Sequence, residues 1–282
     1  LANVLAAHAF QISRFSPQGQ VSPISQVVAK FDQAVVTFGD PKAMAPLSLQ
    51  CSTPEAAKGT GRWLSASEWA FEFDQALPAG VACTALVNSS LKSASGASYT
   101  GTTSYKFNSG GPTVQQIWPD SDNRIDEDQA FVMQLNGPAT LASVQANLWC
   151  AAEGLGERVA IKLIDGKDRL ALLKSQRLEA QAAKEPLSLV TLACNRRLTP
   201  ATKVQLVFGK GVATPTAPGT TGAGVTSTAE QRFSFQVREP FSASFSCERQ
   251  NAQSACLPIR PLSLNFNAPL SCINPCTFLC CK

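Results

Sequence analysis

The sequence predicts an all-β protein: tandem immunoglobulin-like β-sandwiches, one helical insertion in the second domain and a truncated third domain. The first observation is a repeat, in which a short turn leads into an alternating strand and a small polar loop, at residues 27–35, 131–138 and 262–269. An internal repeat of this kind indicates a string of similar domains. The second is composition, because 44% of the 282 residues are hydrophobic and only 16% are charged. Low charge with abundant Thr, Ser, Gly and Pro is typical of short strands and turns.

The first predicted domain spans residues 10–110. Trp69, Phe71 and Phe73 alternate with other residues, and a period of two over this length indicates a half-buried strand. The sequence Leu-Pro-Ala-Gly at 77–80 predicts a turn before a strand over 81–87. About seven short strands, with turns roughly every 8–12 residues, are typical of an immunoglobulin-like sandwich.

The second predicted domain spans residues 111–239. Residues 108–112, Asn-Ser-Gly-Gly-Pro, have the composition of a domain boundary, so we expect a protease-accessible linker there. Residues at about 167–184 are good helix formers and Pro186 follows them, which predicts one continuous helix along the sandwich edge. In that helix Leu170 and Leu173 share a face. Residues 240–270 are predicted to start a third β domain.

The two ends of the chain differ from the rest. Residues 1–9 are small and mostly apolar, and Ala7-His8-Ala9 fits the rule for signal-peptide cleavage, so we interpret them as a signal-peptide remnant. The alternative is an ordinary apolar strand or linker. Residues 271–282 form a Cys-rich tail, interpreted as read-through or a shifted frame, with a genuine Cys-rich cap as the alternative. Export predicts a location in the periplasm or cell envelope.

The cysteines are distributed by domain. Of the ten, six are disulfide candidates, and one pair within each unit is the simplest pairing that crosses no domain boundary: Cys51 with Cys83, Cys150 with Cys194, and Cys247 with Cys256. Six cysteines alone allow 15 connectivities. The alternative is reduced, buried thiols in a cytosolic protein. A metal site is not expected, because the chain has no C-x-x-C and a single histidine.

No segment of the sequence predicts catalysis. With His8 as the only histidine, a Ser–His–Asp or Cys–His arrangement cannot be assembled. The acidic segment 120–128 has Asp120 and Asp122 at calcium-loop spacing, but Arg124 and Ile125 do not fit, so a solvated turn is the preferred interpretation. No phosphate loop is present, and the net charge of +4 lacks a basic run for nucleic acid. We therefore expect no cofactor, no small-molecule substrate and no nucleic-acid partner.

Four tryptophans raise the question of sugar binding. Trp69 and Trp149 lie on alternating strands, which predicts core positions. Trp63 and Trp118 lie near turns and are the better candidates for a surface contact.

Several motifs follow one another in an order that resembles a known family. They are Phe-Ser-Pro-Gln-Gly-Gln-Val at 15–21, Gly-Arg-Trp at 61–63 with 69–73, Leu-Pro-Ala-Gly-Val-Ala-Cys at 77–83, 107–112, and Ile-Asp-Glu-Asp-Gln-Ala-Phe at 125–131. Together they resemble the N-terminal immunoglobulin-like region of the bacterial alpha-2-macroglobulin family, the large extracellular alpha-helical proteins. The resemblance covers about residues 10–270.

This resemblance implies a periplasmic protease trap, in which a bait segment is cleaved and, in many members, a Cys–Gln thioester captures the protease. The thioester motif is C-x-E-Q, whereas Cys247-Glu248-Arg249-Gln250 has another order. Neither a bait region nor a thioester domain is recognisable in this chain.

The functional prediction is therefore structural, with no enzymatic activity. The chain is predicted to supply scaffold domains of an exported macroglobulin-like protease inhibitor. Its partners would be the remaining domains of the parent protein and, through the full-length protein, proteases. The alternative is a stand-alone adhesin or cell-surface binding module, because fold alone does not decide function.

Overall fold

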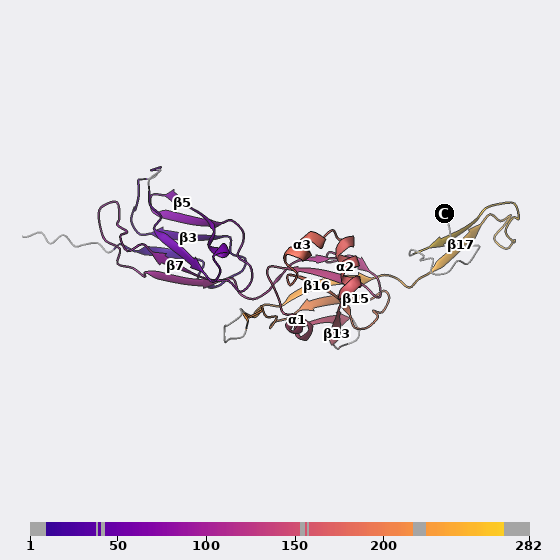
Figure 1. Cartoon of the computed structure of the whole chain (residues 1–282). Helices are drawn as coiled ribbons and strands as arrows, with labels where there is room; N and C mark the ends of the chain where they lie inside the picture. Colours follow the sequence, from indigo (N-terminus) through magenta and orange to yellow (C-terminus); the bar gives the residue numbers. More distant parts are fainter. Residues whose placement is uncertain are drawn as a thin grey trace, which may run out of the picture.

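The computed structural model describes residues 10–37, 39–40, 43–152, 156, 158–216 and 224–267. Two β-sandwiches and a β-hairpin follow one another in sequence order (Figure 1). The predicted signal-peptide remnant 1–9 and the Cys-rich tail 271–282 lie outside the described residues. Within the described part, no helix is long and apolar enough to cross a membrane.

The first sandwich has two four-stranded sheets. Their strand orders are β1-β3-β6-β5 and β2-β8-β7-β4, with β2 parallel to β8, which is the arrangement of an immunoglobulin-type fold. The elements are β1 (Ile12–Ser16), β2 (Gly19–Gln20), β3 (Gln26–Phe31), β4 (Leu47–Cys51), the 3-10 helix Glu55–Ala57, β5 (Gly59–Ser65), β6 (Glu68–Phe73), β7 (Ala82–Val87) and β8 (Ser104–Asn108).

Aromatic side chains fill the core between these two sheets. The Trp69 side chain of β6 is 2% exposed, and Phe31 of β3 stacks on Phe10 with ring centroids 5.5 Å apart. Phe107 of β8 is buried against them from the opposite sheet. The alternation that predicted a half-buried β6 thus has its physical cause in a core that takes every second side chain.

The second sandwich is one folded sheet of eight strands, in the order β10-β16-β15-β12-β13-β14-β11-β9. Strand β13 joins the two layers, because its first half pairs with β12 and its second half with β14. The elements are β9 (Val114–Trp118), β10 (Arg124–Ile125), β11 (Ala130–Leu135), α1 (Leu141–Asn147), β12 (Leu148–Ala152), β13 (Arg158–Leu163), α2 (Gly166–Ser175), α3 (Glu179–Lys184), β14 (Leu189–Cys194), β15 (Lys203–Phe208) and β16 (Gln231–Val237).

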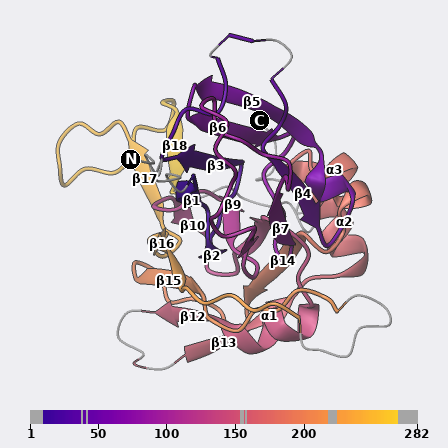
Figure 2. The same cartoon turned by 90° about the vertical axis from the view of Figure 1, so that its left-hand side faces the viewer.

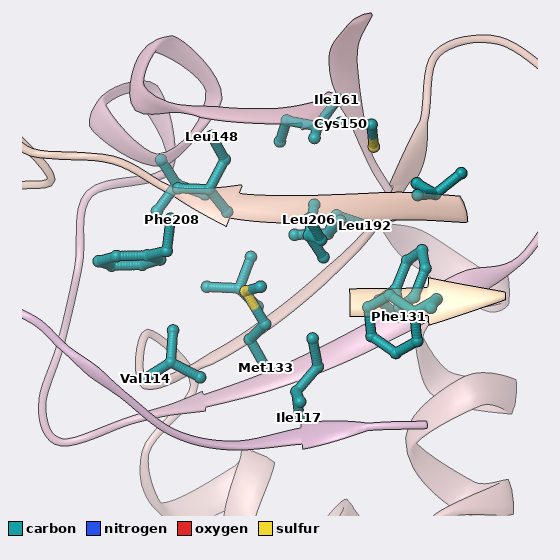
Figure 3. Close-up of a cluster of buried hydrophobic side chains, with 14 of the residues drawn as sticks. Val114, Ile117, Phe131, Met133, Leu148, Cys150, Ile161, Leu192, Leu206 and Phe208 are labelled. Atoms are coloured by element: carbon teal, nitrogen blue, oxygen red, sulfur yellow. The ribbon is translucent and has the colours of Figure 1, made fainter. Parts of the chain in front are cut away.

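Aliphatic side chains dominate the core of the second sandwich (Figure 3). Met133 of β11 and Leu192 of β14 project from one layer and are fully buried. Leu206 and Phe208 of β15 meet them from the other layer. Helix α1 ends where β12 begins. Its Val144 is buried in the same core.

The helical insertion differs from the single helix predicted at 167–184. It is two helices, α2 and α3, separated at residues 176–178, where Arg177 has a φ of 58° that an α-helix cannot contain. Leu173 packs on Val132 and Leu189, on the outer face of the sheet rather than its edge, whereas Leu170 is 64% exposed. Figure 2 shows α2 and α3 along the right-hand side of the second sandwich and α1 near its lower end.

The last described element is a hairpin of β17 (Ala243–Cys247) and β18 (Leu262–Phe266). The register pairs Ala243 with Phe266 and Phe245 with Leu264, so one face carries apolar side chains, and the other carries serines and Asn265. Among the described residues nothing covers the apolar face: Phe245 is 53% exposed and Leu264 44%. The hairpin therefore has the pattern of a half-buried strand pair with its core side uncovered.

Candidate functional site

The junction between the two sandwiches brings together turns that are far apart in the sequence. Residues 77–80 of the first sandwich, the segment 109–112 and residues 136–138 of the second sandwich meet there (Figure 1). The expectation of an accessible linker is wrong, because Ser109, Gly110, Gly111 and Pro112 are all buried. Its Gly-Gly-Pro composition serves close packing instead of mobility.

Ser109 anchors this buried linker. Its hydroxyl accepts a hydrogen bond from the Val81 backbone N–H at 3.0 Å and donates to the Pro78 carbonyl at 2.5 Å. Its own N–H donates to the Val81 carbonyl, 2.9 Å away. Gly80 adds a backbone bond to the Gly110 carbonyl at 2.7 Å. The turn 77–80 and the linker are thereby held as one unit.

Hydrogen bonds also join the two sandwiches directly. The Ala79 N–H donates to the Asn136 carbonyl at 3.2 Å, and the Asn136 side-chain NH₂ donates to the Ser22 hydroxyl at 3.2 Å. The side-chain oxygen of Asn136 accepts a hydrogen bond from the Thr113 N–H at 2.8 Å. Asn136 therefore binds both the first sandwich and the segment that follows the linker.

Two glycines permit this close approach. A Cβ on Gly137 would lie 2.6 Å from the Ala79 nitrogen in the other sandwich. A Cβ on Gly111 would lie 2.1 Å from the backbone carbon of Thr226. Contacts this short do not occur with backbone atoms, so any larger residue would force the elements apart. The sequence signals for this site were the Gly-Pro turns themselves, whereas nothing in the sequence singled out Ser109 or Asn136.

The six disulfide candidates form three bonds: Cys51–Cys83, Cys150–Cys194 and Cys247–Cys256. Cys51 and Cys83 face each other on neighbouring strands β4 and β7. Cys150 and Cys194 pair with residues on either side of the layer switch in β13, so their bond ties the two layers together. The third bond joins the last residue of β17 to the loop between β17 and β18. Three disulfides are typical of an exported protein that folds in an oxidising compartment.

The acidic segment 120–128 consists of two turns on either side of the short strand β10, and two of its carboxylates pair with arginines. Asp126 lies 3.2 Å from Arg238, and Glu127 lies 2.5 Å from Arg197. The described residues contain no group of three or more His, Cys, Asp or Glu side chains placed to hold a metal ion.

The structure confirms the predicted core position of Trp69 and differs from the sequence interpretation for the other three tryptophans. Trp69 is buried, but Trp149 is half-buried on the outer face, with the Arg158 guanidinium 3.9 Å from its ring centroid. Trp63 and Trp118, the surface candidates, are both half-buried: Trp63 donates to the Met44 carbonyl at 3.3 Å, and Trp118 packs beside the helical insertion. Neither forms an open platform for a sugar.

Burial shifts the pKa values of two side chains, Tyr99 and Arg169. Desolvation raises the pKa of Tyr99, and a hydrogen bond with Tyr105 raises it further. Desolvation lowers the pKa of Arg169, whose guanidinium donates to the carbonyls of Leu189 and Pro186 and to the Thr191 hydroxyl. Arg169 therefore fastens α2 to the start of β14.

Comparisons with known protein families and with curated proteins found no match. Among solved structures, the L,D-transpeptidase LdtMt1 in complex with imipenem is 15% identical over 55% of this chain and 64% of that chain, with a TM-score of 0.27. L,D-transpeptidase 3 from Mycobacterium tuberculosis is 13% identical over 56% and 58%, with a TM-score of 0.28. This chain thus spans less than two thirds of the length of either.

Two further structures cover more of this chain. A titin tandem segment is 7% identical over 82% of this chain and 66% of that chain, with a TM-score of 0.23. Domains 1–6 of the surface layer protein SbsC are 14% identical over 93% and 32%, with a TM-score of 0.27. Likenesses this distant assign no activity, so the immunoglobulin-type assignment depends on the strand orders given above.

Proposed function

We propose that this chain supplies non-catalytic scaffold domains of an exported bacterial macroglobulin-like protease inhibitor in the periplasm or cell envelope. The observation that carries the proposal is the junction, where a buried linker and direct hydrogen bonds through Asn136 hold two sandwiches in one relative orientation. A scaffold must fix the orientation of its domains, whereas domains within a chain otherwise move by default.

The motif order supports the same proposal. Segments 77–83 and 107–112, which carry the resemblance to the macroglobulin family, are the segments that meet at the junction. The hairpin β17–β18 adds a second line of support, because its uncovered apolar face fits the opposing sheet of a third sandwich. A two-stranded hairpin is marginally stable in water by itself. In this proposal the bait segment, the thioester and the covering sheet belong to other parts of the parent protein.

The test is the size and behaviour of the natural protein. An antibody raised against the second sandwich should recover, from the cell-envelope fraction, a species much larger than 282 residues. Trypsin should cleave that species at a few sites and remain bound to it. This chain alone should leave trypsin activity unchanged. Recovery of a protein of about this length, or stoichiometric trypsin retention by this chain alone, would contradict the proposal.

A stand-alone adhesin or cell-surface binding module is the second candidate. The observation that favours it is the same exposed apolar face, in which Phe241, at 57% exposed, stacks on Phe266. A binding module would use these side chains to contact a partner. Replacing Phe245 and Leu264 with Ser should then abolish attachment of coated beads to host or cell-wall material, whereas a scaffold would show no attachment in either form.

A further inference from the structure

A cleft of about 490 Å³ lies beside the junction, between the two sandwiches. Its walls are the turn around Gln75 and Pro78 of the first sandwich and the loop 185–188 that follows α3. Its floor is the outer face of the second sandwich at Gln115 and Gln134. This junction cleft has the size and the interdomain position that ligand sites favour.

Backbone hydrogen bonds fix one wall of the junction cleft, the loop 185–188, to the second sandwich. The Leu135 N–H donates to the Ser188 carbonyl at 2.8 Å, and the Ala139 N–H donates to the Leu187 carbonyl at 3.0 Å. Gln115 is the extra residue of a β-bulge in β9, since Gln134 pairs with Gln116 while Leu135 pairs with Val114. A bulge redirects a side chain from the regular alternation, which here places Gln115 at the cleft.

Three carboxamide side chains line this cleft and are not bound to other groups of the described residues. Within the described part of the chain, the side chains of Gln75, Gln115 and Gln134 form no hydrogen bond. Each offers two N–H donors and an acceptor oxygen, which is the same set of groups that a peptide unit presents. Carboxamides along one cleft therefore supply the donors and acceptors that the main chain of an extended peptide can pair with.

The charges around the cleft select the kind of ligand. The cleft itself has one charged residue, Glu185, whose carboxylate accepts the Ser188 hydroxyl at 3.2 Å and is thereby oriented. A second hollow of about 320 Å³ continues from it along the first sandwich, sharing Gln75 and Pro78, and adds Glu55, Asp74 and Lys58. Carboxylates outnumber cations along both, and neither hollow contains an aromatic ring for stacking a sugar or a base.

From this geometry we infer that the junction cleft binds an extended polypeptide segment with an Arg or Lys side chain. The main chain bonds to the carboxamides of Gln115 and Gln134, and the cation pairs with Glu185. The inference goes beyond the scaffold role, and it holds for either candidate function because it depends only on the two described sandwiches.

The test uses side-chain NH₂ resonances of the intact ¹⁵N-labelled chain, which report directly on the carboxamides. The probes are blocked pentapeptides, Ala-Ala-Arg-Ala-Ala and Ala-Ala-Glu-Ala-Ala, and the sugar chitotetraose, each titrated to about 10 mM, where millimolar ligands saturate. The arginine peptide should shift the Gln115 and Gln134 signals and bind about tenfold more tightly than the glutamate peptide.

Substitutions separate the two contacts. Gln134→Ala should weaken both peptides, whereas Glu185→Gln should remove the preference for arginine and leave residual binding. Gln253→Ala, an exposed glutamine of the hairpin loop, is the matched control and should change nothing. Shifts with chitotetraose but not with the peptides, equal binding of both peptides to the unaltered chain, or no shift at all would overturn the inference.

Discussion

The buried contact between helix α2 and the sheet predicts a large loss of stability for one leucine substitution. A second leucine in the same helix provides the control. Leu173 and Leu170 both lie in α2, three residues apart, and both would be changed to Ala. Leu173 is 1% exposed and packs on Val132 and Leu189, whereas Leu170 is 64% exposed. Because the helix and the substitution are the same, the difference between the variants isolates burial from helix propensity.

The expected magnitude follows from the size of the cluster. Fully buried Leu→Ala changes cost about 2–5 kcal/mol, less where the surroundings can collapse into the space. The cluster around Leu173 has only three fully buried members and partly exposed neighbours, so we expect about 2–3 kcal/mol. Leu170→Ala should change stability by less than about 0.5 kcal/mol.

The assay is amide hydrogen exchange of α2 and α3, combined with guanidinium unfolding. If the insertion opens locally, exchange in both helices should accelerate roughly 30- to 140-fold in Leu173→Ala, with less change in β12 and β15. The reasoning would be refuted by equal effects of the two substitutions. A fully protected insertion in Leu173→Ala with unchanged unfolding would refute it equally.

Three further outcomes are expected. Gly137→Ala should open the junction and expose residues 109–112 to elastase, which cuts after small residues and should leave this segment uncut in the unaltered chain. The pKa of Tyr99 is raised by burial, so the stability it contributes is present below about pH 10 and is lost as the pH rises above it; Tyr99→Phe should flatten this alkaline loss in a thermal-denaturation series. Removing the Cys150–Cys194 bond by a double Ala substitution should cost about 4 kcal/mol on loop length alone, measured in guanidinium.

Each has its own control. Gly59→Ala places a Cβ 2.2 Å from the Glu72 carbonyl inside the first sandwich, so it should lower stability and yet leave the linker protected. If Gly59→Ala exposes the linker equally, the junction contact is not specific. Alkaline loss that persists unchanged in Tyr99→Phe would assign it to another group. The short Cys247–Cys256 loop should contribute only about 3 kcal/mol, so a larger loss there than at Cys150–Cys194 would contradict the loop-length argument.

The sequence by itself determined the strands and the sandwich class. Alternation such as that of Trp69 and Phe73 shows which side of a strand faces a core. The pattern depends only on the residues of that strand, so it can be recognised without knowing which element packs against it. The spacing of cysteines between turns likewise indicated one bond in each unit. The helical insertion was recognisable from its composition, but its break at Arg177 was not, because that residue's backbone is set by how α3 folds back onto the sheet.

Only the tertiary structure decided the role of the turns. Residues 109–112 have the composition of a mobile linker. A glycine in a sequence is compatible both with a mobile segment and with a closely packed backbone, so composition does not distinguish the two. Which one applies at Gly111 depends on the backbone of Thr226, more than a hundred residues later, lying against it. The junction cleft has the same origin: Gln75, Gln115 and Gln134 are ordinary polar residues along the chain, and they become a set because two separately folded sandwiches are held in one orientation.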